Sequence, residues 1–220
     1  MNAAKSKIFI VDDHPLVREW LTNLIEQTPD LTVCGEAEDA QVALQAIARA
    51  VPNLAIVDLS LGNGSGIDLI RSVRALFPNL AVIVLSMHDE RVYAERSIRA
   101  DAHGYIMKRE STKKIIEAIH HVLEGKMYIS KELTEAFAAK FVTGPSPGKG
   151  TQIGQLSDRE LEVFQLIGQG YETRQIAKTL NVNIKTVQTY CTRIKDKLKF
   201  STGAELLREA IRWNESGSPR

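Results

Sequence analysis

Short apolar runs alternate with amphipathic segments through the first 125 residues, and this alternation is the feature that most restricts the fold. The runs are rich in β-branched residues and cover residues 8–11, 31–34, 54–57, 81–85 and 104–107. Each is followed by a segment of helical period, starting near Pro15, Ala40, Gly66, Glu90 and Thr112. Strands that are apolar on both faces and alternate with helices predict a parallel sheet covered on both sides. We therefore expect a five-stranded, doubly wound α/β domain.

The pattern changes after residue 125. Residues 132–142 predict one more helix, and the Gly, Pro and Ser of "TGPSPGKGTQIGQ" (143–155) predict a flexible linker. Beyond it the periodicity predicts only helices: one that begins at Ser157 or Asp158, with Glu160 placed for a capping box, and others near residues 173–180, 184–198 and 203–213. The sequence thus predicts a first domain over 1–125, a linker helix and flexible linker over 126–155, and an all-α domain over 156–220.

The two middle helices of the second domain are separated only by Asn181-Val182-Asn183, the spacing of a helix-turn-helix. Apolar residues of these helices predict their inner faces, and Lys185, Gln188, Thr189, Thr192 and Arg193 are left for an outward face. Residues 151–220 carry 11 Lys and Arg against 8 Asp and Glu. A solvated helix in a four-helix core would show a similar pattern, but a polar and basic outward face after a helix-turn-helix favours DNA binding.

Composition excludes several classes of protein. With 44% hydrophobic and 25% charged residues the chain has ordinary globular composition. It has no apolar run of membrane-spanning length and no apolar signal-peptide core near residue 1, so we expect a cytoplasmic protein that does not engage a membrane. Its two cysteines, Cys34 and Cys191, predict neither a disulfide framework nor a zinc site.

Polar side chains follow four of the five predicted strands. Asp12 and Asp13 follow the first, Asp58 the third, Ser86 the fourth and Lys108 the fifth. One acid of the adjacent pair would suffice to cap the next helix, whereas the carboxyl ends of parallel strands meet at one edge where ligands bind. Three carboxylates there predict a hard divalent cation, and we expect Mg²⁺. Lysine and hydroxyl groups suit a phosphoryl group, and Asp58 becomes the natural nucleophile.

Residues 7–124 resemble the receiver domain of two-component response regulators, a flavodoxin-like fold. The residues that carry the resemblance are the acidic pair of "VDDHP", Asp58 in "IVDLSL", Ser86 in "VIVLSMHD" and Lys108 in "GYIMK". The resemblance implies that Asp58 accepts a phosphoryl group from a histidine kinase or a small phosphodonor. It also implies that Ser86 and Lys108 bind the phosphate, and that Tyr105 changes rotamer when Ser86 is drawn in.

The same resemblance implies a ligand set for Mg²⁺, formed by Asp13, Asp58 and the backbone carbonyl of Ser60, with Asp12 acting directly or through water. The loop after Asp58 departs from the family, since Gly62 stands where a proline is usual, while Gly66 stands where the family has glycine. The "GNGSG" stretch lacks the G-x-x-x-x-G-K-[ST] pattern of a nucleotide-binding loop.

Residues 154–214 resemble the LuxR-type helix-turn-helix of the NarL/FixJ class. "LSDRELEVF", Gly170, "IAKTL", "KTVQTY" and "IKDKL" carry this resemblance. It implies that residues 184–198 are the recognition helix, with Gln188, Thr189 and Thr192 facing bases and Lys185, Arg193 and Lys197 facing phosphates. Two positions that are often Lys or His are Gln188 and Tyr190 here, and Gln favours adenine.

Together these features predict a transcription regulator that phosphorylation of Asp58 shifts toward a dimer bound to double-stranded promoter DNA. The last helix, with Leu206, Leu207, Ala210 and Ile211, is expected either to form the dimer face or to close the core of its own domain. Three alternatives remain open at this stage: a regulator that binds DNA without phosphorylation, an aspartyl-phosphate hydrolase, and an adaptor that binds another protein through the helix-turn-helix.

Overall fold

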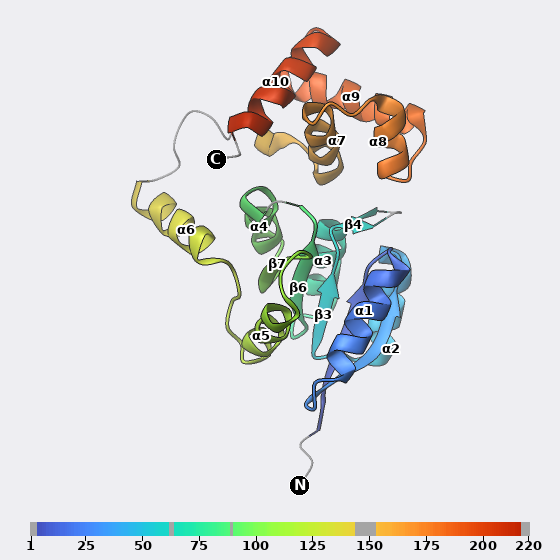
Figure 1. Cartoon of the computed structure of the whole chain (residues 1–220), viewed down its shortest axis with the longest axis vertical. Helices are drawn as coiled ribbons and strands as arrows, with labels where there is room; N and C mark the ends of the chain where they lie inside the picture. Colours follow the sequence, from blue (N-terminus) through green and yellow to red (C-terminus); the bar gives the residue numbers. More distant parts are fainter. Residues whose placement is uncertain (1–3, 62–63, 89, 144–152, 217–220) are drawn as a thin grey trace. The chain divides into compact units, whose positions relative to one another are not determined.

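The computed structural model describes residues 4–61, 64–88, 90–143 and 153–216 (Figure 1). The chain divides into two compact units, an N-terminal unit of Met1–Val142 and a C-terminal unit of Thr143–Arg220. The predicted flexible linker falls largely on residues 144–152, which lie outside the described residues. Among the helices that are described, none is both long and apolar enough to cross a membrane.

The N-terminal unit is built on a five-stranded parallel sheet with the order β2-β1-β3-β6-β7. Its strands are β1 (Ser6–Val11), β2 (Leu31–Ala37), β3 (Leu54–Val57), β6 (Ala81–Ser86) and β7 (Gly104–Met107). The helices that follow are α1 (Pro15–Glu26), α2 (Ala40–Ala50), α3 (Gly66–Leu76), α4 (Glu90–Arg99) and α5 (Thr112–Leu123). The predicted five-stranded α/β domain is therefore confirmed.

Alternation along the central strand β1 divides its side chains between two cores. Ile8 and Ile10 belong to one cluster with residues of α1 and α5, including Leu21, Ile25 and Ile115. Phe9 and Val11, also fully buried, lie outside that cluster and point to the opposite face. Because a strand buried on both faces needs apolar residues at every position, it forms a continuous apolar run. This is why the strands could be predicted from the sequence.

Two short pieces of structure were not anticipated. Directly after β3, the two-residue strands β4 (Ser60–Leu61) and β5 (Gly64–Ser65) pair antiparallel. At the edge of the five-stranded sheet, Tyr128 pairs with strand β7. Its N–H donates to His103 O at 2.9 Å, and its carbonyl accepts from the Tyr105 N–H at 3.0 Å. A bridge formed by one residue is too short to produce a periodic pattern in the sequence.

Helix α6 (Lys131–Thr143) follows Tyr128.

The C-terminal unit contains a short 3₁₀ helix η1 (Ile153–Gln155) and the helices α7 (Asp158–Gly168), α8 (Thr173–Thr179), α9 (Ile184–Leu198) and α10 (Gly203–Ser216). The predicted capping box is present, since the Ser157 side chain accepts from the Glu160 N–H while the Glu160 carboxylate accepts from the Ser157 N–H. Helices α7 and α10 approach closely at Gly168, where a Cβ would lie 2.3 Å from Ala210 O. The fold thus confirms the all-α domain with its helix-turn-helix.

Candidate functional site

The polar residues predicted to converge do meet at the carboxyl edge of the N-terminal sheet. Backbone hydrogen bonds carry the sheet ladder one residue past the strand ends: Asp58 N–H donates to Val11 O at 2.8 Å, and Lys108 N–H donates to Ser86 O at 2.8 Å. Asp12 N–H donates to Ala37 O at 3.1 Å in the same way. The main chain of these residues is therefore hydrogen-bonded to the sheet.

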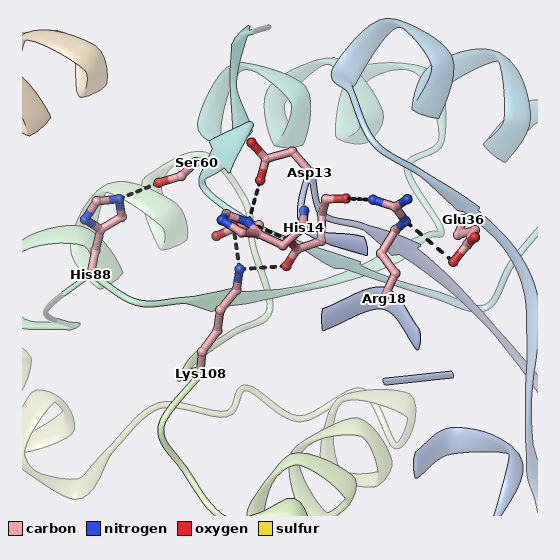
Figure 2. Close-up of polar contacts among 9 residues, drawn as sticks. Asp13, His14, Arg18, Glu36, Ser60, His88 and Lys108 are labelled. Carbon is pink, nitrogen blue, oxygen red and sulfur yellow. Dashed lines mark hydrogen bonds and ion pairs between the residues drawn. The ribbon is translucent and has the colours of Figure 1, made fainter. Parts of the chain in front are cut away.

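Lys108 stands between two buried carboxylates. Its Nζ lies 2.7 Å from Asp12 Oδ2 and 2.7 Å from Asp58 Oδ2, and Figure 2 shows its side chain extended toward the acidic residues. Asp12 and Asp58 are 1% and 2% exposed. With both acids ionised the trio carries one excess negative charge, which favours the entry of a cation.

The pKa values of the cluster reflect this balance. Burial raises the pKa of Asp58. The charge of Lys108 lowers this pKa and the Asp12 carboxylate raises it, and the net shift is upward. Burial opposes the charge of Lys108, but Asp58 and Asp12 outweigh it and raise the pKa of the lysine. Burial and the excess negative charge thus favour the protonated form of Asp58, and the negative charge favours that of Lys108; a divalent cation would relieve this excess charge.

The donor set suits a hard divalent cation. Ligand atoms of Asp12, Asp13, His14 and Asp58 all lie within 4.8 Å of one another. Oδ1 of Asp58 is buried and accepts no hydrogen bond, in contrast to Oδ2, which Lys108 holds. An unpaired buried carboxylate oxygen is costly unless a ligand completes it. The carboxylates fit Mg²⁺, for which oxygen ligands are preferred.

His14 is a member of the cluster that the sequence reasoning overlooked. Its Nδ1 lies 2.7 Å from Asp13 Oδ1 and 3.2 Å from Asp12 Oδ1. On the other side of Asp12, Arg18 Nη1 donates to the Asp12 carbonyl at 2.7 Å and its Nε lies 3.6 Å from Glu36 Oε2 (Figure 2). The signal for His14 was its place directly after the acidic pair.

His88 also joins residues that the sequence analysis treated separately. Its Nε2 lies 2.7 Å from Ser60 Oγ (Figure 2), and its backbone N–H donates to Ser86 Oγ at 3.2 Å. Its carbonyl accepts from the Tyr105 hydroxyl at 2.9 Å, and its ring stacks on that of Tyr93. The Ser60 hydroxyl is thus in contact with His88, and the ligand role of the Ser60 carbonyl stays a prediction.

Gly66 explains how the loop after Asp58 returns so close to it. A Cβ at Gly66 would lie 2.2 Å from Asp58 O and 2.6 Å from Leu59 Cα. Its N–H donates to Leu59 O at 3.0 Å. The glycine is required for close approach to the backbone of the proposed nucleophile. Gly62, where the family usually has proline, lies outside the described residues.

In the C-terminal unit, helix α9 presents the face that its periodicity predicted. Val187, Ile194 and Leu198 are buried, and Ile176 and Ala177 of α8 are buried with them. The exposed residues include all the predicted DNA-facing ones, Lys185, Gln188, Thr189, Thr192, Arg193 and Lys197. The helix begins at Asn183, whose Oδ1 accepts from the Thr186 N–H at 2.8 Å.

Three of the predicted DNA-facing side chains have partners within the protein. Thr189 and Thr192 donate their hydroxyl protons to the carbonyls of Lys185 and Gln188, so they present methyl groups and oxygen lone pairs outward. Lys197 differs more strongly from the expectation. Its Nζ lies 2.6 Å from Oε2 of the buried Glu160, so its ammonium is directed to α7.

Helix α10 carries the four apolar residues that were expected either to form a dimer face or to close the core of their own domain. Leu206 and Ala210 are buried within the unit, whereas Leu207 and Ile211 are 44% and 39% exposed. One side of the helix therefore closes the domain core, and the other leaves two apolar side chains at the surface.

Comparisons with known proteins cover both units. Residues 8–120 match the family described as "Response regulator receiver domain", and residues 154–210 match "Bacterial regulatory proteins, luxR family". The chain is 34% identical over 207 residues to the transcriptional activator protein ExaE of Pseudomonas putida, covering 93% of this chain and 95% of that protein. It is 32% identical over 211 residues to the oxygen regulatory protein NreC of Staphylococcus epidermidis, covering 94% and 97%.

Solved structures show the same likeness. RcsB of Salmonella enterica serovar Typhimurium, bound to promoter rprA in the presence of the phosphomimetic BeF₃⁻, is similar with a TM-score of 0.59 and 28% identity over 93% of this chain and 97% of that one. The response regulator ChrA of a heme-sensing two-component system is similar with a TM-score of 0.52 and 26% identity, over 97% of this chain and 99% of that one.

Proposed function

The chain belongs to the two-component response regulators that join a receiver domain to a LuxR-type DNA-binding domain, and from this premise we propose that it is switched by a phosphoryl group on Asp58. The observation that carries the proposal is the buried carboxylate of Asp58, with Oδ2 held by Lys108 and Oδ1 without a hydrogen-bond partner. The first oxygen fixes the orientation of the carboxylate, and the second is left for a ligand.

The proposed reaction is a phosphoryl transfer. A carboxylate oxygen of Asp58 attacks the phosphorus of a phosphohistidine on a histidine kinase, or of a small phosphodonor such as acetyl phosphate. An O–P bond forms, the bond from phosphorus to the imidazole nitrogen or acyl oxygen breaks, and the leaving group keeps that electron pair. Lys108 and the Ser86 hydroxyl lie at the same sheet edge and would stabilise the charge on the transferred phosphoryl oxygens.

Asp12, Asp13, Asp58 and the carbonyl of Ser60 are the proposed holders of Mg²⁺, which supplies positive charge against the phosphoryl oxygens. The chain's own contribution is to keep this site negatively charged and to bury two of its carboxylates. Asp12 and Asp58 are almost fully buried, and Lys108 is the cation that restrains them. His14 restrains Asp13 from the exposed side.

The proposed output is binding of a homodimer to double-stranded promoter DNA in the cytoplasm. Helix α9 would enter the major groove, with Gln188, Thr189 and Thr192 toward bases and Lys185 and Arg193 toward phosphates. The exposed Leu207 and Ile211 of α10 suit a dimer face. A full shift from 1:99 to 99:1 needs about 5.5 kcal/mol, so we propose a partial shift of a pre-existing equilibrium.

The test is the intact mass of the protein after incubation with acetyl phosphate and Mg²⁺, with gel filtration of the same samples. The wild type should gain one phosphoryl group and shift toward the dimer, Asp58→Asn should do neither, and Asp68→Asn, at an exposed position of α3, should behave as the wild type. Absence of any adduct would favour a regulator that works without phosphorylation. Sustained consumption of acetyl phosphate that requires Asp58 would instead favour a hydrolase.

A further inference from the structure

We propose that Lys197 does not contact DNA but is a positioning residue that locks the end of the recognition helix α9 onto the start of α7 through Glu160. The inference rests on the proposed function, in that α9 is taken as the helix that reads DNA. The carrying observation is the distance of 2.6 Å between Lys197 Nζ and Glu160 Oε2, across 37 positions of sequence.

Glu160 is a fixed and buried partner. The residue is 2% exposed, and its Oε2 also accepts the Ser157 N–H at 2.7 Å as part of the capping box of α7. Burial alone would raise the pKa of Glu160, but the hydrogen bonds from Lys197 and from Ser157 outweigh it and lower the pKa. The carboxylate is therefore ionised at neutral pH, and a buried anion requires a cation close to it.

The position of Lys197 around the helix axis supports this assignment. At about 100° per residue, Lys197 lies about 120° from Lys185 and only about 60° from the buried Ile194. Arg193, by the same count, is about 80° from Lys185 and remains on the outward side. Lys197 is thus on the flank next to α7, where its side chain is 38% exposed.

The outward side of the last turn of α9 carries the opposite charge. Asp196 is exposed and, at about 100° per residue, lies about 20° from Lys185, in line with the proposed DNA face. A carboxylate there repels phosphates, and the basic residues of the last turn lie to either side of this line: the half-buried Lys195 about 80° from Lys185, and Lys197 about 120° from it. The DNA-facing set is then Lys185, Gln188, Thr189, Thr192 and Arg193.

The test combines salt dependence with a double-mutant cycle in the full chain. Glu160→Gln removes the charge but keeps a residue that can complete the capping box, and Lys197→Gln removes the cation. Binding to a duplex of arbitrary sequence is measured against salt concentration, and thermal unfolding of the C-terminal unit is followed by Trp213 fluorescence in a Trp20→Phe background. Loss of one phosphate contact reduces the slope of log K against log salt by about 0.9.

We expect Glu160→Gln and the double variant to lower the unfolding midpoint by a similar amount, about 5 °C, because the interaction is absent from both. Lys197→Gln should lower it at least as much, because it leaves the buried Glu160 carboxylate without its cation. We also expect each to leave the salt slope unchanged and Lys197→Arg to restore the midpoint. Lys185→Gln is the matched control and should reduce the slope by about 0.9 without lowering the midpoint.

A slope reduced by about 0.9 in Lys197→Gln would overturn the proposal, as would additive effects of the two single variants. If the wild type binds no duplex at any salt concentration, the proposed DNA function fails. The thermal cycle still decides in that case whether Glu160 and Lys197 are coupled.

Discussion

The hydroxyl of Tyr105 donates a hydrogen bond of 2.9 Å to the backbone carbonyl of His88, which ties a buried side chain of β7 to the loop after β6. The N–H of the same His88 donates to Ser86 Oγ. Ser86 and Tyr105, the two residues expected to move together on phosphorylation, are therefore already joined through one residue. A shift of the Ser86 hydroxyl toward a phosphoryl group would have to be accommodated at His88.

Removal of this hydroxyl should destabilise the N-terminal unit. Tyr105 is 1% exposed, so Tyr105→Phe leaves the His88 carbonyl without that donor at a cost of about 1 kcal/mol. The measurement is the free energy of unfolding in urea. Tyr128→Phe is the control, because the hydroxyl of Tyr128 makes no hydrogen bond within the described part of the chain, and it should change stability by less than about 0.5 kcal/mol. Equal effects of the two variants would contradict this prediction.

Neutralising Asp58 should stabilise the metal-free protein at neutral pH. The folded chain raises the pKa of this carboxyl, so the folded state binds its proton more tightly than the unfolded state. Stability from this group is therefore present at acidic pH and is lost as the pH rises through its raised pKa. We expect Asp58→Asn to raise the thermal midpoint by a few degrees at pH 7, as measured in the presence of EDTA.

The advantage of Asp58→Asn should shrink as the pH falls, because the wild-type carboxyl then becomes neutral as well. Glu38→Gln, at an exposed position, should leave the midpoint unchanged across the same range. A midpoint for Asp58→Asn below that of the wild type at pH 7 would show that the pair with Lys108 outweighs the burial of the carboxylate.

Gly66 should tolerate no side chain. Since a Cβ would lie 2.2 Å from Asp58 O, Gly66→Ala must displace the backbone of Asp58 or Leu59, and we expect a loss of about 1–3 kcal/mol in unfolding free energy. Uptake of phosphate from acetyl phosphate should fall with it. The control is Gly203→Ala in the first turn of α10, where nothing lies within 4 Å of a Cβ. A stable Gly66→Ala protein with normal uptake would refute the steric argument.

The recognition helix should depend on its cap. Asn183 Oδ1 accepts from the Thr186 N–H at 2.8 Å and from the Thr186 hydroxyl at 3.0 Å, so Asn183→Ala should cost about 1 kcal/mol in unfolding free energy of the C-terminal unit. Ser111 is the matched control, because it occupies the N-cap of α5 with extended backbone but makes no side-chain cap hydrogen bond. Ser111→Ala should be nearly neutral. A cap variant as stable as this control would show that packing alone sets the start of α9.

Much of the fold is readable from local patterns. Strands β3 (Leu54–Val57) and β7 (Gly104–Met107) have the predicted bounds, and helices α1 to α5 begin where the helical period begins. The reason is that burial on both faces or on one face imposes a period on neighbouring residues. The convergence of Asp12, Asp58 and Lys108 was also predictable, because parallel strands end at a common edge.

Tertiary structure decided which side chains meet when neither strand order nor periodicity relates them. His88 contacts Ser60 from 28 positions away, and Lys197 finds Glu160 from 37 positions away. Periodicity places Lys197 on the flank of α9, but only the packing of α7 beside it supplies the buried carboxylate that draws its ammonium inward. The sequence by itself determined the elements, the sheet edge and the faces of the helices. Which residue pairs with a charged side chain such as Lys197 depended on which helix packs beside it, because a buried carboxylate is stable only with a cation in contact with it.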